Sequence, residues 1–405
     1  MIAPTHTAID RVTGEVRRPG VAPATSIIVA RPFEWRSPAT IEPRRWLYPH
    51  HYIRRFVGAT ISPGGIGKSS LVTTEALALV TGRDLLGVFP TERCRVWLWQ
   101  GEDPLEEMQR RIGAAMLHFG IDPSEVAGRL FVNSGRDDDL CIAEQDRNGV
   151  KIAAPVVEAV IATIRANAVD VVIVDPFVST HRVVENDNPA IDRVTKTWAR
   201  IADATDCAIE LVHHSRKTGG AETTVEDGRG ASALLATVRS ARVLNVMTED
   251  EAARAGVHNR FAHVRVDAGK SNLAPRSEAA TWLRMVSVPL GNGPLGTDGD
   301  KVGVFEPWQW PNPFDGLAVS DLEKVQAAVM VGRWRKDSQA KDWVGHAIAD
   351  ALGIDLADKA ARSRVKLLQR TWTTNGALVE FAEKDEARKA RTFVTSGSIE
   401  EGGAP

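Results

Sequence analysis

The chain has 405 residues, of which 43% are hydrophobic and 25% are charged, and its formal net charge is -2. This is the balance of an ordinary globular protein, and the length allows two or three domains. A chain so close to neutral is no polycation, so any binding to nucleic acid must depend on local basic patches. No apolar run approaches the roughly 18 residues of a membrane span, and no signal-peptide core begins the chain. We therefore expect no membrane segment and a cytoplasmic location.

The first 290 residues contain an irregular arm and then a regular alternation of elements. Residues 1–44 are rich in Pro, Thr, Arg and Ala without periodicity, which predicts a flexible N-terminal arm. In residues 45–290, apolar runs alternate with amphipathic stretches, which predicts an α/β domain with a mostly parallel sheet flanked by helices. The runs expected to form strands are residues 56–62, 95–99, 130–132, 169–174 and 208–212. Alternating residues between 260 and 290 predict further antiparallel strands at the sheet edge.

The most specific motif lies between the first predicted strand and the apolar helix expected over residues 71–80. It is a Gly-rich turn followed by Gly-Lys-Ser, the pattern of a phosphate-binding P-loop, although its first position is Ser62 rather than Gly. Lys68 would reach the β- and γ-phosphates, and the Ser69 hydroxyl would hold Mg²⁺. The residues expected to bind ATP are Gly64, Gly65, Ile66, Gly67, Lys68, Ser69 and Ser70.

ATP hydrolysis needs carboxylates beside the P-loop, one to position Mg²⁺ and one to activate water. Asp175 ends the apolar run 169–174, and we expect it to bind Mg²⁺ together with Ser69. Glu102 follows the predicted strand 95–99, at the strand end where ligands bind in open α/β sheets, and is expected to polarise the attacking water. Asp103 is the alternative, and either acid could instead serve only to cap the helix expected over residues 104–118.

His213 and His214 stand at the carboxyl end of the predicted strand 208–212. A polar side chain there can sense the γ-phosphate, although two structural histidines in a polar turn would look the same. A metal site has no support, because no third ligand stands at a telling spacing. The three cysteines (Cys94, Cys141 and Cys207) lack C-x-x-C spacing and indicate buried thiols in a reducing compartment.

The last quarter of the chain predicts a separate small domain. Residues 291–316 are full of Gly, Pro, Asn and Asp and are expected to be a linker, whereas residues 396–405 are expected to be a disordered tail. Residues 317–395 contain helical patterns followed by two strand-like runs, the order of a winged-helix-like domain. Its second patterned helix carries five basic residues, namely Lys359, Arg362, Arg364, Lys366 and Arg370. They suit a DNA backbone, a solvated helix face or a replication partner equally well.

Five motifs together resemble RecA-type ATPases, and within them the hexameric replicative helicases of the plasmid RepA kind. The similarity spans roughly residues 45–290, and it also extends to phage- and island-encoded AAA-family ATPases. The motifs are Ser62-Pro-Gly-Gly-Ile-Gly-Lys-Ser69, Gly101-Glu-Asp-Pro104, Ile173-Val-Asp-Pro176, His213-His214 and Arg229-Gly-Ala-Ser232. The resemblance implies a RecA-like fold, ATP and Mg²⁺ as cofactors, and assembly of identical subunits into a ring of six.

The resemblance also implies a role for each matching residue. The implied catalytic set is Lys68 on phosphate, Glu102 as general base, Asp175 on Mg²⁺, His214 as γ-phosphate sensor and Arg229 as a finger acting in trans on a neighbouring subunit. Arg239 and Arg242 are rivals for the finger, and Lys270 is a weaker candidate for reaching the nucleotide. A trans arginine would stabilise charge on the transferred phosphoryl group and couple hydrolysis to assembly.

In RecA-type proteins the loop after the sensor strand lines a channel for single-stranded DNA. The corresponding residues 215–230 are polar, and Arg216 and Lys217 could contact phosphates. No aromatic residue in this loop could stack on a base. The leading expectation is an ATP-driven motor on single-stranded DNA, a replicative helicase of a phage or mobile element. The alternatives are a RecA-like ATPase that loads replication or repair factors, and a P-loop small-molecule kinase.

Overall fold

The computed structural model describes residues 30–216, 222–228, 230–275, 280–384 and 388–397. The chain divides into two units, Met1–Pro43 and Arg44–Pro405. In the first unit the described residues contain one short turn of 3₁₀-helix, η1 (Pro38–Thr40). The flexible arm expected at the N-terminus stays a prediction.

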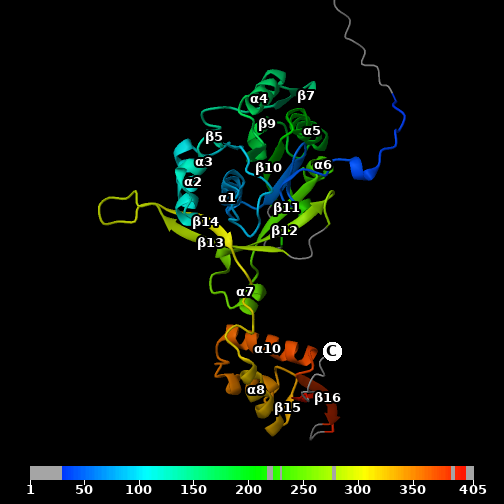
Figure 1. Cartoon of the computed structure of the whole chain (residues 1–405), viewed down its shortest axis with the longest axis vertical. Helices are drawn as coiled ribbons and strands as arrows, with labels where there is room; N and C mark the ends of the chain where they lie inside the picture. The colour runs from blue at the N-terminus through cyan, green and yellow to red at the C-terminus, as the bar shows by residue number, and fades with distance from the viewer. Residues whose placement is uncertain (1–29, 217–221, 229, 276–279, 385–387, 398–405) are drawn as a thin grey trace, which may run out of the picture. The chain divides into compact units, whose positions relative to one another are not determined.

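A nine-stranded sheet dominates the second unit, and its order is β14-β13-β12-β11-β3-β10-β8-β4-β5 (Figure 1). From β11 to β5 each strand runs parallel to its neighbour, whereas β12, β13 and β14 continue the sheet as an antiparallel edge. The strands are β3 (Val57–Ser62), β4 (Val96–Gln100), β5 (Leu130–Ser134), β8 (Val171–Asp175), β10 (Ala208–His214), β11 (Ser240–Val246), β12 (His263–Ser271), β13 (Thr281–Pro289) and β14 (Lys301–Pro307). The predicted mixed, mostly parallel sheet is confirmed.

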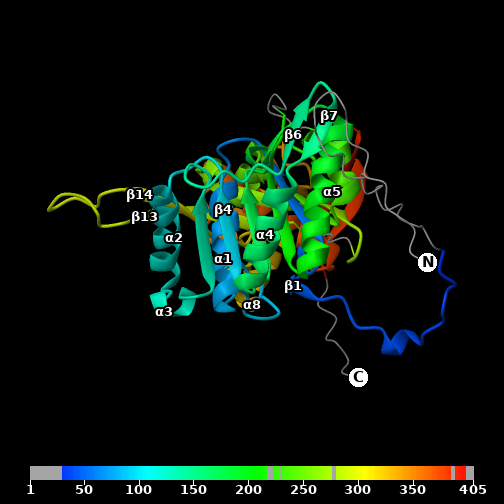
Figure 2. The ribbon, with the colours of Figure 1, turned by 90° about the horizontal axis from the view of Figure 1, so that it is seen from above.

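Helices cover both faces of this sheet, as Figure 2 shows from above. One face carries the P-loop helix α1 with α2, and the other carries α4, α5 and α6. The helices are α1 (Lys68–Thr81), α2 (Leu105–Phe119), α3 (Pro123–Val126), α4 (Ala154–Ala166), α5 (Asn188–Thr205), α6 (Ala231–Thr237) and α7 (Glu249–Ala255). Together with the sheet they form the RecA-like α/β fold.

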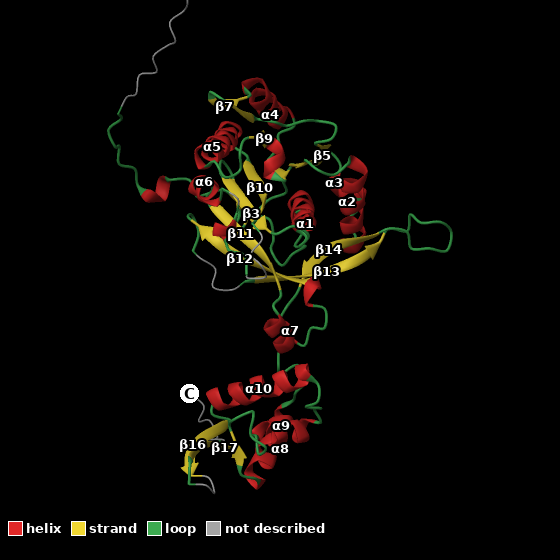
Figure 3. Cartoon of the chain, turned by 180° about the vertical axis from the view of Figure 1, so that it is seen from behind, coloured by secondary structure: helices red, strands yellow, loops and turns green. Residues whose placement is uncertain are grey.

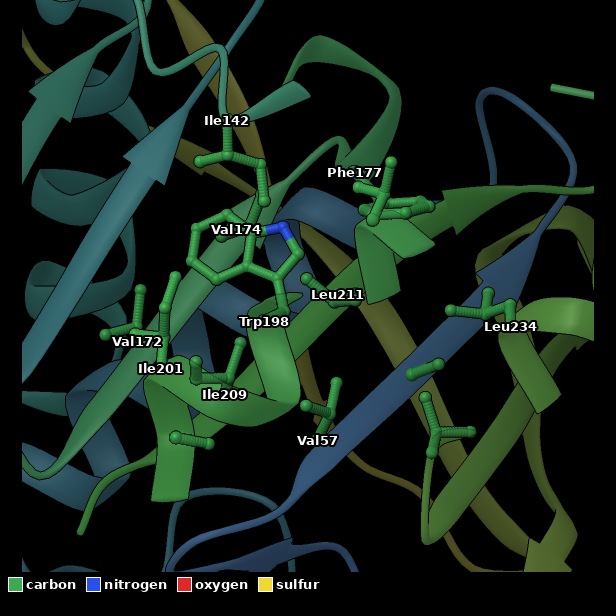
Figure 4. Close-up of a cluster of buried hydrophobic side chains, with 14 of the residues drawn as sticks. Val57, Ile142, Val172, Val174, Phe177, Trp198, Ile201, Ile209, Leu211 and Leu234 are labelled. Atoms are coloured by element: carbon green, nitrogen blue, oxygen red, sulfur yellow. The ribbon is translucent and has the colours of Figure 1, made fainter. Parts of the chain in front are cut away.

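The central strands are apolar throughout because both of their faces are buried. In β8, Val172 and Val174 face the core on the α5 side, whereas Val171 and Ile173 face the core on the α1 side. Trp198 of α5 is fully buried, and Figure 4 shows its indole ring lying over side chains of the sheet strands. The labelled neighbours in that view are Val57, Ile142, Val172, Val174, Phe177, Ile201, Ile209, Leu211 and Leu234.

Short elements join the main ones. Two small sheets pair β1 with β2 and join β7, β6 and β9. Their strands are β1 (Trp46–Tyr48), β2 (Tyr52–Ile53), β6 (Ala143–Asp146), β7 (Gly149–Ile152) and β9 (His181–Arg182). Three further 3₁₀ turns are η2 (Phe177–Thr180), η3 (Val225–Asp227) and η4 (Arg260–Ala262).

The linker expected over residues 291–316 is wrong in part. Strand β14 lies inside it and pairs along its whole length with β13, from Leu283 opposite Pro307 to Pro289 opposite Lys301. Val304 and Phe305 are buried, at 1% and 0% exposure, so this strand belongs to the core of the sheet. The Gly- and Pro-rich turns on either side hid its apolar pattern.

The C-terminal part has a hydrophobic core of its own, which includes Val325, Trp343, Leu368 and Trp372. Figure 3 shows its helices beside a small sheet, whose strand order is β15-β17-β16. In chain order its elements are α8 (Val319–Val331), β15 (Trp334–Arg335), α9 (Val344–Leu352), α10 (Lys359–Thr374), β16 (Leu378–Lys384) and β17 (Ala390–Ser396). The winged-helix assignment itself stays a prediction. Across the described parts of the chain, no helix combines the length and apolarity needed to span a bilayer.

Candidate active site

The P-loop joins β3 to α1 at the carboxyl edge of the parallel sheet. Gly65 and Gly67 have φ angles of 79° and 101°, in the left-handed region that favours glycine. A Cβ on Gly67 would lie 2.5 Å from Cε of Met285 and 2.7 Å from Cε2 of Phe305, so the second glycine is also required by space. A Cβ on Gly65 would meet no atom within 4 Å, because this side of the loop is open. The loop therefore offers an open backbone face before the positive end of a 14-residue helix, which suits a phosphate.

Lys68 begins α1, and its ammonium group lies at the centre of the site. Nζ donates to the backbone oxygens of Ser62 and Pro63 at 3.1 and 2.9 Å and lies 3.1 Å from Nδ1 of His214. Burial lowers the pKa of Lys68, while the nearby carboxylates of Asp175 and Glu102 act to raise it. An incoming phosphate would compete with these backbone oxygens for the ammonium group.

Asp175 and Ser69, the two residues expected to hold Mg²⁺, are in contact. Asp175 is only 4% exposed at the end of β8, and it accepts hydrogen bonds from the Ser69 hydroxyl and, at 3.2 Å, from Nε2 of Gln100. Burial raises the pKa of Asp175, although the Ser69 hydroxyl and the Lys68 ammonium act in the opposite direction. One carboxylate, one hydroxyl and phosphate oxygens are a ligand set typical of Mg²⁺. In keeping with this small set, the described residues contain no group of three or more His, Cys, Asp or Glu side chains suited to a metal.

The two adjacent acids after β4 differ in their contacts. Oδ2 of Asp103 lies 2.6 Å from Nη1 of Arg111, so this carboxylate is already paired. The Glu102 side chain is exposed and forms no ion pair with any residue that the structure describes, although its charge acts on both Lys68 and Asp175. The geometry favours Glu102 over Asp103 as the group that faces an attacking water.

The two histidines at the end of β10 lie in different surroundings. His213 is 1% exposed, and its ring centroid lies 5.7 Å from that of Phe177. His214 pairs in register with Ser62, the last residue of β3, and its ring contacts Lys68. Because β10 lies between β3 and β8, its end reaches the space between the P-loop and Asp175. His214 is therefore the one placed to sense phosphate, and His213 belongs to the core.

The candidate arginine fingers and DNA contacts are only partly covered. Arg229 and Lys217 lie outside the described residues. Arg216 is exposed, and its Nη2 lies 3.3 Å from Oδ1 of Asn186. Arg242 is corrected as a finger candidate, because its guanidinium is buried and both of its terminal nitrogens donate to Glu75 at 2.6 Å.

Arg239 and Lys270 lie at the opposite edge of the sheet from the P-loop. Arg239 precedes Ser240, which pairs with Gly58 at the start of β3, and Lys270 pairs with Ala241 of β11. The expectation that Lys270 reaches the nucleotide of its own subunit is therefore wrong. Its Nζ donates to the backbone oxygen of Leu235 instead.

The structure adds two residues that the sequence analysis missed. Gln100 links the carboxylates, because its Nε2 donates to Asp175 and its Oε1 accepts from the backbone N–H of Glu102 at 3.4 Å. Arg111 of α2 holds Asp103. The only signal for Gln100 is a polar residue at the end of an apolar strand, immediately before Gly101.

A family match agrees with this geometry. Residues 25–220 match the family model described as an AAA domain. Among solved structures, the crystal structure of the RadB recombinase is 12% identical, with 58% of this chain and 89% of that chain covered and a TM-score of 0.38. A second solved structure, the ATPase domain of a helicase, is also 12% identical, with 57% of this chain and 82% of that chain covered and a TM-score of 0.40. The AAA-domain match includes the P-loop, Glu102, Asp175 and His214, and the chain thus carries a RecA-type P-loop ATPase domain.

Proposed function

We propose that this chain is an ATP-hydrolysing motor on single-stranded DNA, a replicative helicase that works as a ring of six identical subunits. The observation that carries the proposal is the convergence of the catalytic side chains at one edge of the parallel sheet. Lys68 and His214 are in contact, and Ser69 bonds to Asp175. Glu102 lies near enough for its charge to act on both Lys68 and Asp175.

In this mechanism each group has one task. Lys68 neutralises phosphate charge, Ser69 and Asp175 hold Mg²⁺, and Glu102 orients the attacking water. His214 starts the loop from which Arg216 and Lys217 would touch DNA phosphates, so a change at the γ-phosphate has a short route to the DNA. An arginine from the neighbouring subunit, with Arg229 as first choice, would complete the site in trans.

The test is the ATPase rate with and without single-stranded DNA, together with the particle mass by light scattering in ATP and Mg²⁺. We expect a DNA-stimulated rate in a six-subunit particle, and strand displacement on a forked substrate. Lys68→Ala serves as the control and should lose turnover while keeping its thermal transition.

Other outcomes point to other functions. A monomer or dimer whose rate ignores DNA would overturn the motor and favour an ATPase that loads replication or repair factors. Turnover that needs a small acceptor molecule and ignores DNA would instead favour a kinase.

A further inference from the structure

The exposed face of α10 in the C-terminal part is uniformly basic or hydroxylic. The apolar face of this helix is buried in the C-terminal core through Val365, Leu368 and Trp372. On the other side, a stripe at helical spacing contains Lys359, Ser363, Lys366, Arg370 and Thr374, of which only Ser363 is half-buried. The helix sequence contains neither Asp nor Glu, so no acid interrupts the stripe.

Only three of the five basic residues in this helix lie on that face. Arg362 donates to the backbone oxygen of Ser338 and lies 5.1 Å from the ring centroid of Trp343. Arg364 donates to the backbone oxygen of Pro313 at 2.8 Å. Both arginines hold the helix in place, which leaves Lys359, Lys366 and Arg370 directed to the outside.

Beside the stripe lies a groove of ≈ 480 Å³ between α10 and the strands β15 and β16. Its lining residues are Lys336, Ser338, Lys366, Gln369, Arg370, Thr373, Thr374 and Glu380. Glu380 is the single acid among them, and its Oε2 is taken by Nζ of Lys336 at 2.7 Å. Lys366 and Arg370 form no ion pair with any described residue, so their positive charges are available to a partner.

A second groove of ≈ 510 Å³ shares Lys336 and continues along β17. Arg335, Arg391 and Thr392 line it together with Lys336. The basic surface therefore extends from the helix across the edge of the small sheet, and a long polyanion would contact it at several points.

We propose that the C-terminal part binds double-stranded DNA through this face, with phosphates in the groove between α10 and β15–β16. A helix about 10–12 Å across fits the major groove, which is about 12 Å wide. The stripe from Lys359 to Thr374 extends over about 22 Å at 1.5 Å per residue, long enough to follow several phosphates of a rigid duplex. A single strand is the poorer fit, because the stripe presents no aromatic ring on which bases could stack.

The experiment measures binding of the full chain to a fluorescein-labelled 20-base-pair duplex and to either of its single strands. Fluorescence anisotropy is recorded without nucleotide, over a series of salt concentrations. Lys366→Gln/Arg370→Gln removes two positive charges from the face. Lys301→Gln/Lys324→Gln removes two charges from exposed lysines elsewhere and is the matched control.

We expect the Lys366→Gln/Arg370→Gln variant to lose at least about tenfold in duplex affinity at low salt, and the slope of log K against log salt to fall by about two. The control variant should match the unaltered chain, and basal ATPase rate and thermal transition should be unchanged in both. The proposal fails if the unaltered chain does not bind duplex, or if both variants bind it equally well. It also fails if single-strand affinity falls as much as duplex affinity, because the face would then not select duplex.

Discussion

At the scale of single residues, the site separates two adjacent acids by their partners. Asp103 is held by Arg111 at 2.6 Å, whereas the Glu102 carboxylate lies exposed beside Lys68 and Asp175. A catalytic base must be able to accept a proton from water, and a carboxylate engaged by a guanidinium is poorly suited to do so. The two acids thus form a natural pair of test and control.

Glu102→Gln should lower kcat by roughly 10²–10⁴-fold and leave ATP binding intact, because it removes a base without removing a phosphate contact. Asp103→Asn should keep kcat near the original value and cost at most about 1 kcal/mol of stability through its partly exposed ion pair. Single-turnover hydrolysis and binding of a fluorescent ATP analogue measure the two effects. Equal loss in both variants would contradict the assignment.

The raised pKa of Asp175 predicts a pH effect on Mg²⁺ binding. Because burial raises the pKa of the folded carboxyl above its ordinary value of 3.8, this group takes up its proton at a higher pH than an exposed aspartate. Mg²⁺ needs the deprotonated form, so its affinity should fall as the pH is lowered toward that raised pKa. The sign for stability is opposite, since this group's stabilising contribution is present at low pH and is lost as pH rises through the folded pKa.

Titration of Mg²⁺ into the ATP-analogue complex at several pH values checks this expectation. The charged groups that act on Asp175 are Lys68, Glu102 and Arg111, so the variant Asp175→Asn is the necessary comparison. It should bind Mg²⁺ weakly and without the same pH dependence. A pH dependence that survives in this variant would assign the titration to another group.

At the scale of elements, a buried polar network ties the P-loop helix to the sheet. Glu75 of α1 accepts two bonds from Arg242 of β11 and one, at 2.7 Å, from the Tyr52 hydroxyl. Nε of Arg242 also donates to Thr60 of β3 at 2.9 Å. Arg242 thus contacts both the strand that enters the P-loop and the helix that leaves it.

Arg242→Met should destabilise the protein by about 3–5 kcal/mol, because it leaves the Glu75 carboxylate buried without its cation. The double variant Glu75→Leu/Arg242→Met should recover most of that loss, since both charges are then gone. Urea unfolding of the single and double variants measures the coupling. If the double variant is no more stable than the single one, the ion pair does not govern the stability of this region.

The sequence predicted those parts of the site that are local along the chain. The P-loop, Asp175 and His214 each follow an apolar strand directly, so their place at the sheet edge was evident. The Glu75–Arg242 pair joins residues 167 positions apart, and no periodicity reveals such a contact. For that reason Arg242 was open as a finger candidate. Strand β14 was missed because Gly, Pro and Asn dominate the turns around its short apolar run.

At the scale of the whole molecule, hydrolysis by a ring should depend on pairs of subunits. Arg229→Ala and Glu102→Gln each inactivate a different side of an interface, so a mixture should regain part of the activity through interfaces that carry both intact residues. The measurement is ATPase rate against mixing ratio, with each variant alone as the baseline. Arg239→Ala, on the edge of the sheet opposite the P-loop, is tested in the same way.

A mixture that stays inactive, although both variants bind ATP and assemble, would contradict a trans role for Arg229. Recovery with Arg239→Ala instead would transfer the finger to Arg239. Arg242 needs no such mixing experiment, because its guanidinium is committed to Glu75 within the subunit.

The antiparallel edge of the sheet has a practical consequence for dissecting the protein. Met285 and Phe305 form the wall against which Gly67 packs, and the Ser70 hydroxyl donates to the backbone oxygen of Gly303 at 2.9 Å. An expressed fragment that stops at residue 290 would keep every catalytic motif and still lack this wall. A minimal ATPase must therefore extend through Pro307, and clones truncated earlier would be misread as catalytically defective when they had only lost their support.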